Sequence, residues 1–196
     1  SDGEPIWLRT YDGTASGNDG ATAIVLDADG NVIVTGLSMG KSGLGSFSDC
    51  VTIKYSPDGV PLWVNRYNGP GNNEDSPVDV AVDSAGNVFV TGASQTHEED
   101  FDYLTLAISR EGEGLWARQY NGPGNNNDFG KALAVDHNGK VFVTGFSGSA
   151  GPTSIAEYAT VGYSPTGSLL WTNRYHANDL QQGSYNLASD VVVDNA

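Results

Sequence analysis

The sequence is poor in several residue types, and each shortage excludes a class of protein. Only nine of its 196 residues are Lys or Arg, against 24 Asp or Glu, so its formal net charge is -15. Nucleic acids require a basic surface and anionic lipid repels an acidic one, so we expect no nucleic-acid partner and no membrane insertion. No run approaches the roughly 18 apolar residues that span a membrane. A single cysteine, Cys50, excludes an internal disulfide.

What the chain has instead is glycine, 26 residues in all, and a tandem repeat. The run Gly-Asn-Val-Phe-Val-Thr-Gly at 86–92 has copies at 30–36 and 139–145. Four tryptophans recur at intervals of 56, 53 and 55 residues, each followed four residues later by a tyrosine, with an arginine between them: Trp7, Trp63, Trp116 and Trp171. We divide the chain into repeats at about 7–62, 63–115 and 116–170, with a partial repeat at 171–196. Residues 1–196 are therefore expected to form a single repeat array.

Each copy is predicted to hold four strands. In the second copy these are A (78–83), B (87–94), C (103–109) and D (115–120), rich in β-branched and aromatic residues. Turn sequences such as Asp-Ser-Ala-Gly at 83–86 join A to B, and their counterparts join C to D. No window has the periodicity of an amphipathic helix, which indicates an all-β chain.

Some of these strands, such as residues 88–90, are apolar on both faces. A sheet with two apolar faces must lie between two others, so the copies are expected to stack face to face. Four antiparallel strands in about 50 residues, stacked radially, is the architecture of a β-propeller blade.

The repeated pattern Trp…Tyr-Asn-Gly…Asp…Ala-Val-Asp-x-x-Gly-Asn-Val-Phe-Val-Thr-Gly-x-Ser…Asp-Tyr…Ser-Pro-x-Gly…Leu-Trp resembles the SBBP repeat. This is a seven-bladed β-propeller repeat of secreted bacterial proteins. The resemblance implies a bacterial protein exported to the cell surface or medium, and it supplies no catalytic residues. Three complete repeats plus a partial fourth predict an open or incomplete propeller segment.

The two ends of the chain read as single strands of unfinished blades. Residues 4–11 match strand D and residues 187–194 match strand A, with no B or C strand to join them. Either the chain is a segment of a longer array, or neighbouring molecules supply the missing strands. Unpaired edges of this kind can promote self-association.

The connections fall into two sets. The A–B and C–D turns are mostly tight, whereas the B–C loops (38–48, 94–100, 147–156) and the D–A connections are longer and mostly unlike one another. Variable loops on a rigid scaffold favour recognition, with neutral insertions as the alternative. The candidate ligand-binding residues on this loop face are Asn72, Asn73, Asp75, His97, Asn125, Asn126 and Asp128.

Three aspartates at the same repeat position, Asp19, Asp75 and Asp128, are candidate Ca²⁺ ligands at the mouth of the central channel. The alternative is that Asp and Asn in these connections bond their own backbone in turns. Two further motifs are coincidences of the repeat. Asp27 opens a hairpin turn rather than a calcium loop, and the Gly-x-Ser of residues 36–38 ends a strand in every copy.

These observations predict a non-enzymatic, extracellular β-propeller module without a resident cofactor, which binds protein or carbohydrate at a bacterial surface or serves as a scaffold there. One alternative is a filament subunit joined through its incomplete blade. The other is a propeller hydrolase or lyase acting on polysaccharide, for which His97, Glu98, Glu99 and Glu157 are the candidate residues.

Overall fold

The protein is described from a computed structural model, which covers residues 3–15, 17–40, 47–97, 100–148, 156–176 and 186–194. These residues form twelve β-strands in three antiparallel sheets of four. Blade 1 holds β1 (Asp19–Leu26), β2 (Val32–Met39), β3 (Ser48–Tyr55) and β4 (Pro61–Tyr67). Blade 2 holds β5 (Asp75–Val82), β6 (Val88–His97), β7 (Asp100–Ile108) and β8 (Gly114–Tyr120). Blade 3 holds β9 (Asp128–Val135), β10 (Val141–Gly148), β11 (Ala156–Tyr163) and β12 (Leu169–Tyr175).

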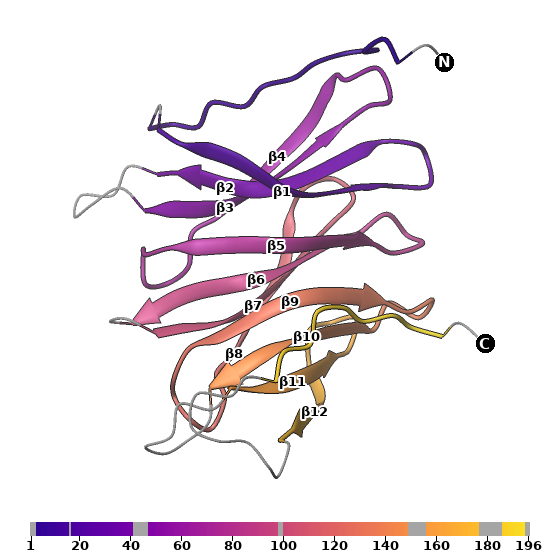
Figure 1. The fold of residues 1–196 in the computed structure, drawn as a ribbon. Coiled ribbons are helices and arrows are strands. Elements are labelled where there is room, and N and C mark those ends of the chain that lie inside the picture. The colour runs from indigo at the N-terminus through magenta and orange to yellow at the C-terminus, as the bar shows by residue number, and fades with distance from the viewer. Residues whose placement is uncertain are drawn as a thin grey trace.

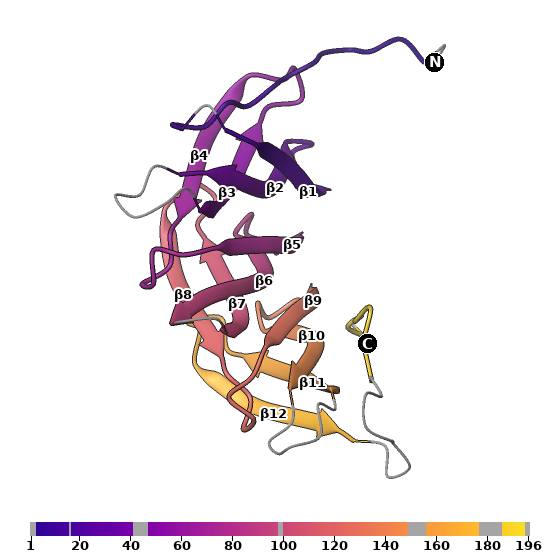
Figure 2. The same ribbon diagram turned by 60° about the vertical axis from the view of Figure 1, so that its left-hand side comes forward.

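The strands of every blade pair in sequence order, as successive hairpins, and the blades stack in turn along the molecule (Figure 1). Figure 2 shows the stack as an open arc, with β1, β5 and β9 on the concave side and β4, β8 and β12 on the convex side. The predicted all-β, propeller-like arrangement of four-stranded blades is therefore confirmed, and it is not closed. Across the ranges covered, no helix is long and apolar enough to cross a membrane.

The threonine and the glycine that end the repeated run each have a structural role, and this role is the same in every blade. In blade 2, the Thr91 hydroxyl donates to the carbonyl of Leu104 on the next strand at 2.8 Å, which satisfies a buried polar group. Gly92 faces a bulge in β5, where a β-carbon would collide with the carbonyl of Ser76 and lie 2.7 Å from the Cα of Pro77. Only glycine allows the two strands to approach this closely.

The repeated tryptophan joins each blade to the next. Trp63 of β4 donates its indole N–H to the carbonyl of Arg110 in the C–D turn of blade 2, at 2.9 Å, and Trp116 of β8 bonds Pro165 of blade 3 in the same way. The turn glycine beneath the first ring, Gly112, has a φ of 93°, and a β-carbon there would lie 2.7 Å from the Trp63 ring. The tryptophans of strands β4 and β8 thus form contacts between blades.

Two apolar cores lie between the sheets. The core between blades 1 and 2 gathers Ile33 and Cys50 with Val80, Val90 and Leu106, and that between blades 2 and 3 has an equivalent composition. Each blade buries both of its faces only where it has a neighbour on both sides. The stacking order therefore decides which apolar faces remain open.

Two expectations about strands were wrong. Residues 4–11 and 187–194, predicted as lone strands D and A, form no strand, because no adjacent B or C strand offers them a hydrogen-bonding ladder. Residues 94–100, predicted as a long loop, belong almost wholly to β6 and β7, whose pairing continues past Ser94 to His97 and Asp100. The two strands of this hairpin continue beyond the apolar residues from which the sequence predicted them.

Candidate functional site

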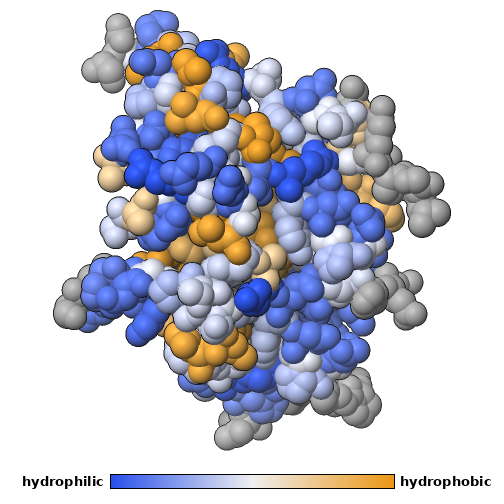
Figure 3. Space-filling view, turned by 180° about the vertical axis from the view of Figure 1, so that it is seen from behind, coloured by the Kyte–Doolittle hydropathy of each residue, from blue (hydrophilic) through white to orange (hydrophobic). Residues whose placement is uncertain are grey.

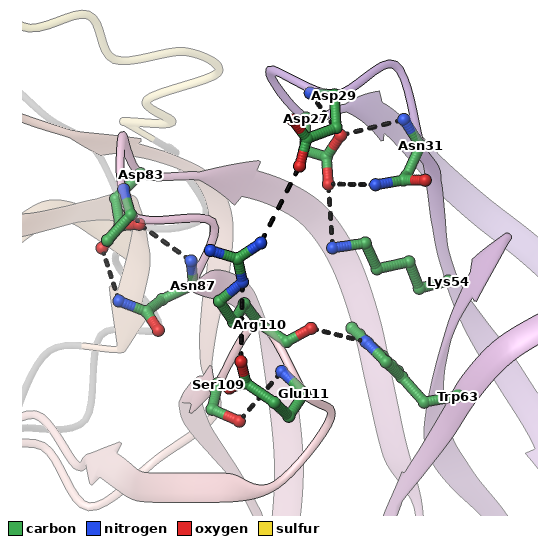
Figure 4. A network of polar contacts seen from close by, with 11 residues as sticks. Asp27, Asp29, Asn31, Lys54, Trp63, Asp83, Asn87, Ser109, Arg110 and Glu111 are labelled. Carbon is green, nitrogen blue, oxygen red and sulfur yellow. Dashed lines mark hydrogen bonds and ion pairs between the residues drawn. The ribbon is translucent and has the colours of Figure 1, made fainter. Parts of the chain in front are cut away.

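The edge that carries the tight turns is built alike in every blade, and its polar residues serve the turns. In blade 1, Asp27 accepts the backbone N–H groups of Asp29 and Asn31, at 3.0 and 2.9 Å, and the side-chain amide of Asn31. Asp83 and Asn87 repeat this arrangement in blade 2 (Figure 4). These bonds agree with the hairpin interpretation of Asp27 and leave this edge without a distinctive site.

Asp27 differs from its counterparts in a buried ion pair. The Lys54 ammonium lies 2.8 Å from the Asp27 carboxylate, and both side chains are almost fully buried. Burial alone would raise the pKa of Asp27, but hydrogen bonds from Lys54 and Asn31 outweigh it and lower the pKa to about 2. The pair ties β1 to β3 at the turn edge.

On the opposite edge, the three aspartates proposed as calcium ligands begin strand A of successive blades. Each accepts a backbone N–H from a glycine of its own D–A connection: Asp19 from Gly13 at 2.9 Å, Asp75 from Gly69 at 2.7 Å and Asp128 from Gly122 at 2.8 Å. These bonds are those that the turn-forming alternative requires. Within the described ranges, no three His, Cys, Asp or Glu side chains come together in a way that could hold a metal ion.

Burial separates the pKa values of these aspartates. Asp75 is 1% exposed, and the loss of hydration raises its pKa to about 6, although bonds from Ser94 and Gly69 act in the other direction. Burial likewise raises the pKa of Asp128. Asp19 lies at the open end of the arc, and a hydrogen bond from Ser38 lowers its pKa.

The repeated arginines are not equivalent, contrary to the sequence alignment. Arg118 stands two residues after its tryptophan and bonds Gly167 of the next blade, whereas Arg66 stands three residues after its own and points back into blade 1. There Arg66 bonds the Asp49 carboxylate at 2.6 Å and the hydroxyl and carbonyl of Ser38.

Arg174 makes the matching contacts in blade 3, with Glu157 at 2.9 Å and the Ser147 hydroxyl at 2.6 Å. In blade 2 this position is Gln119, which bonds Ser94 at 3.1 Å. Blade 2 therefore lacks the guanidinium that its neighbours hold beneath the loop edge.

The candidate asparagines lie in two similar turns. Asn72 and Asn125 are exposed, both have a φ of 49°, and each accepts the side-chain amide of an asparagine four residues earlier. Asn73 is partly buried and Asn126 is exposed. His97 ends β6, and the side chain of that residue lies outside the described structure. The alternative catalytic candidates Glu98 and Glu99 also lie outside the described residues.

A polar pocket of about 170 Å³ lies on this edge of blade 1, beside the turn of Asn72. Its lining is formed by Thr14, Gly40, Phe47, Asp49, Arg66, Asn68 and Asn72. Sequence reasoning identified only the last of these. The signal that could have found the pocket is the shifted position of Arg66, three residues after Trp63, which directs the guanidinium toward the loops.

A second irregularity lies between blades 2 and 3. Phe101 stacks on Phe129 with ring centroids 5.2 Å apart, and Phe129 stacks on Phe146 at 4.9 Å. The Lys131 ammonium lies within 6 Å of two of these rings. The rings cover one another, so this cluster contributes mainly to blade packing.

Comparison with known proteins gives one family match. Residues 63–97 match the family model SBBP, described as a beta-propeller repeat, and they cover the strand-D tryptophan of blade 1 through strand B of blade 2. No curated protein matches the chain. The matched segment includes the Asn-Gly-Pro-Gly turn, the Asp-x-x-Gly-Asn hairpin and the Val-Thr-Gly run described above. The chain thus contains a β-propeller repeat of the SBBP family, built as a module of stacked four-stranded blades.

Proposed function

We propose that this chain is a non-enzymatic, extracellular β-propeller module whose loop edge binds a carbohydrate. The observation that carries the proposal is the polar pocket of blade 1. The pocket combines an aromatic ring, Phe47, with the hydroxyl of Thr14 and the amides of Asn68 and Asn72. Planar polar groups beside an aromatic ring suit the hydroxyls and the C–H face of a sugar.

The size and charge of the pocket support the same ligand class. A volume of about 170 Å³ corresponds to about six water molecules, which is room for a single sugar unit. Asp49 and Arg66 neutralise each other through a 2.6 Å contact, so the pocket carries no strong net charge of its own. A neutral sugar therefore suits it better than an anion.

The proposal that the module is not an enzyme rests on the contacts of Glu157, the acidic candidate residue in blade 3. Arg174 forms an ion pair with one carboxylate oxygen of Glu157 at 2.9 Å, and the ring of His176 lies 3.3 Å from the other oxygen, so both oxygens are engaged within the protein. A general acid needs a carboxyl group whose proton is available to substrate. The proposal of export to a bacterial surface is supported by the resemblance to secreted propeller repeats and by the acidic composition. Fractionation of the producing cells, with antibody detection, would test it.

Binding should be tested with a panel of neutral oligosaccharides, followed by calorimetric titration of any that bind. Phe47→Ala should weaken the affinity about 5- to 30-fold, because stacking of a sugar on the ring contributes on the order of 1–2 kcal/mol. Leu62→Ala, on the convex strand β4, is the control, since Leu62 is also exposed and lies away from the pocket. Equal affinities for the two variants, or no binding by the parent protein, would contradict the proposal.

A further inference from the structure

The polar pocket of blade 1 owes two of its amide groups to a single turn. Asn68 and Asn72 both line the pocket, and the side-chain amide of Asn68 donates to the side-chain oxygen of Asn72 at 3.0 Å. Asn72 has a φ of 49°, and its backbone N–H donates to the carbonyl of Gly69 at 3.0 Å. These contacts close residues 68–72 into a tight turn. The direction of both side-chain amides therefore depends on how this turn is held on the blade.

The side chain beneath this turn is Asp75. Its carboxylate accepts the backbone N–H of Gly69 at 2.7 Å, a length typical of a hydrogen bond to a charged acceptor. Gly69 lies so close that a β-carbon there would be 2.9 Å from the Asp75 carboxylate and 2.8 Å from the Ser94 hydroxyl. Asp75 is 1% exposed, although it begins β5 at the loop edge, which is mostly hydrophilic on the right of the rear view (Figure 3). The turn is thus packed directly on a buried carboxylate.

The groups that interact with the Asp75 carboxylate come from β3, β4 and β6 and from its own connection: Asp49, Cys50, Tyr67, Ser94 and Glu74. Burial raises the pKa values of the Cys50 thiol and the Tyr67 hydroxyl to about 12, so both stay neutral across the physiological range. Arg66 neutralises Asp49 through their 2.6 Å ion pair, and the acidic residue before Asp75 is exposed to screening by salt. Asp75 itself titrates within this range, because burial raises its pKa to about 6.

We propose that Asp75 is a positioning residue of the sugar pocket, and that loss of its negative charge weakens sugar binding. This inference rests on the proposed sugar-binding function. A charged carboxylate accepts the Gly69 N–H about twice as strongly as a neutral carboxyl group does. A protonated Asp75 must also direct its own hydrogen toward an acceptor, and the Ser94 hydroxyl, whose hydrogen bond favours the ionised form, must then reorient. Acidification therefore loosens the turn that presents Asn68 and Asn72 to the sugar.

The connection between blades 2 and 3 contains the same turn, away from that pocket. Asp128 is fully buried and accepts the N–H of Gly122 at 2.8 Å, and the side-chain amide of Asn121 bonds Asn125 at 2.8 Å. Burial raises the pKa of Asp128 as well. Neither of these asparagines lines the polar pocket of blade 1. Asp128 is therefore a matched control, with the same environment and no contact with the proposed sugar site.

The test follows two quantities of the full chain as a function of pH. The first is the NMR resonances of the side-chain amides of Asn68 and Asn72 and of the backbone amide of Gly69, recorded without sugar. In the parent these resonances should shift with a midpoint near pH 6. In Asp75→Asn, whose side chain imitates the protonated acid, they should not shift there. The second quantity is the affinity, measured by calorimetric titration, for the neutral oligosaccharide that binds the parent most tightly at pH 7.5.

The affinity of the parent should fall by up to about tenfold between pH 7.5 and pH 5. With a pKa of about 6, roughly nine-tenths of Asp75 is protonated at pH 5, and the apparent affinity follows the fraction of the protein in the binding state. Asp75→Asn should bind at pH 7.5 as weakly as the parent does at pH 5, with no further change on acidification. Asp128→Asn should keep both the affinity and the pH dependence of the parent.

A second variant changes the titration of Asp75 without replacing it. Gln119 bonds the Ser94 hydroxyl at 3.1 Å, so Gln119→Arg places a positive charge close to Asp75. A neighbouring positive charge favours the ionised carboxylate, so the midpoints of the resonances and of the affinity should both move to lower pH. This variant tests the proposal even where Asp75→Asn fails to fold.

Three results would overturn the proposal. The first is a parent whose sugar affinity is the same at pH 5 and pH 7.5, which would leave the sugar-binding function intact. The second is a pH dependence that persists in Asp75→Asn, since this variant keeps all three histidines and one of them would then be responsible. The third is a set of pocket resonances with no midpoint near pH 6. A parent that binds no oligosaccharide at any pH would refute the sugar-binding function itself, and this inference with it.

Discussion

Replacing Gln119 with arginine should stabilise the protein at neutral pH. Blades 1 and 3 hold a guanidinium beneath the loop edge, where it bonds an acidic side chain and a serine, and blade 2 has Gln119 at the same place. Asp75 of blade 2 is buried, and its pKa is raised to about 6 from an ordinary value of 3.8. A shift of about two units corresponds to a cost of roughly 3 kcal/mol when the group is ionised in the folded state.

The sign of the pH dependence follows from that direction. The folded pKa of Asp75 lies above the unfolded one, so the folded state binds the proton more tightly. The cost is therefore absent below about pH 4, grows as the pH rises to about 6, and is complete above it. A guanidinium beside Ser94 would favour the ionised form and offset part of the cost. We expect Gln119→Arg to gain about 1–2 kcal/mol at pH 7.5 and less at pH 5.

Urea denaturation followed by tryptophan fluorescence at the two pH values measures this difference. A gain of that size raises the melting temperature of a chain of this length by about 4 °C. The reverse change in blade 1, Arg66→Gln, is the matched control and should cost about 2 kcal/mol, because it leaves the largely buried Asp49 unpaired. If Gln119→Arg lowered the stability, or if its gain were as large at pH 5 as at pH 7.5, the argument from the missing guanidinium would be refuted.

Three further substitutions test the contacts that build the blades. Lys54→Met should cost about 3 kcal/mol at neutral pH, since it leaves a buried carboxylate unpaired. The stability from Asp27, whose pKa is lowered to about 2, is present above about pH 4 and is lost as the pH falls toward 2, so the cost should shrink there. Val80→Ala should cost about 2 kcal/mol, whereas Ile24→Ala at the same repeat position should cost less than about 0.5 kcal/mol. Gly92→Ala should cost at least about 3 kcal/mol, because the added β-carbon meets backbone atoms of β5.

The denaturation midpoint of Lys54→Met should be measured at several pH values. For the valine, isoleucine and glycine variants, midpoints at one pH are enough. A cost for Lys54→Met that did not depend on pH would contradict the ion-pair account. Equal costs for Val80→Ala and Ile24→Ala would mean that the face of blade 1 that carries Ile24 is covered in solution. A Gly92→Ala variant as stable as the parent would refute the close approach of β5 and β6.

The sequence alone determined the four strands of each blade, their order within the blade and the stacking of the blades. These follow from local chemistry repeated at a fixed spacing: a turn needs its aspartate and glycine, and a strand apolar on both faces needs a neighbour on each side. Repetition also corrected misleading local motifs, since a pattern such as Gly-x-Ser at 36–38 recurs where only a strand end is needed.

The tertiary structure decided which partners the members of a repeated set contact. Arg66 and Arg118 differ by one place relative to their tryptophans, and alternation along a strand sends them to opposite faces, one into the loop edge and one onto the next blade. It also decided that Ile24 is exposed while Val80 is buried. Burial depends on which blade lies alongside, and nothing in the local sequence of either strand carries that information.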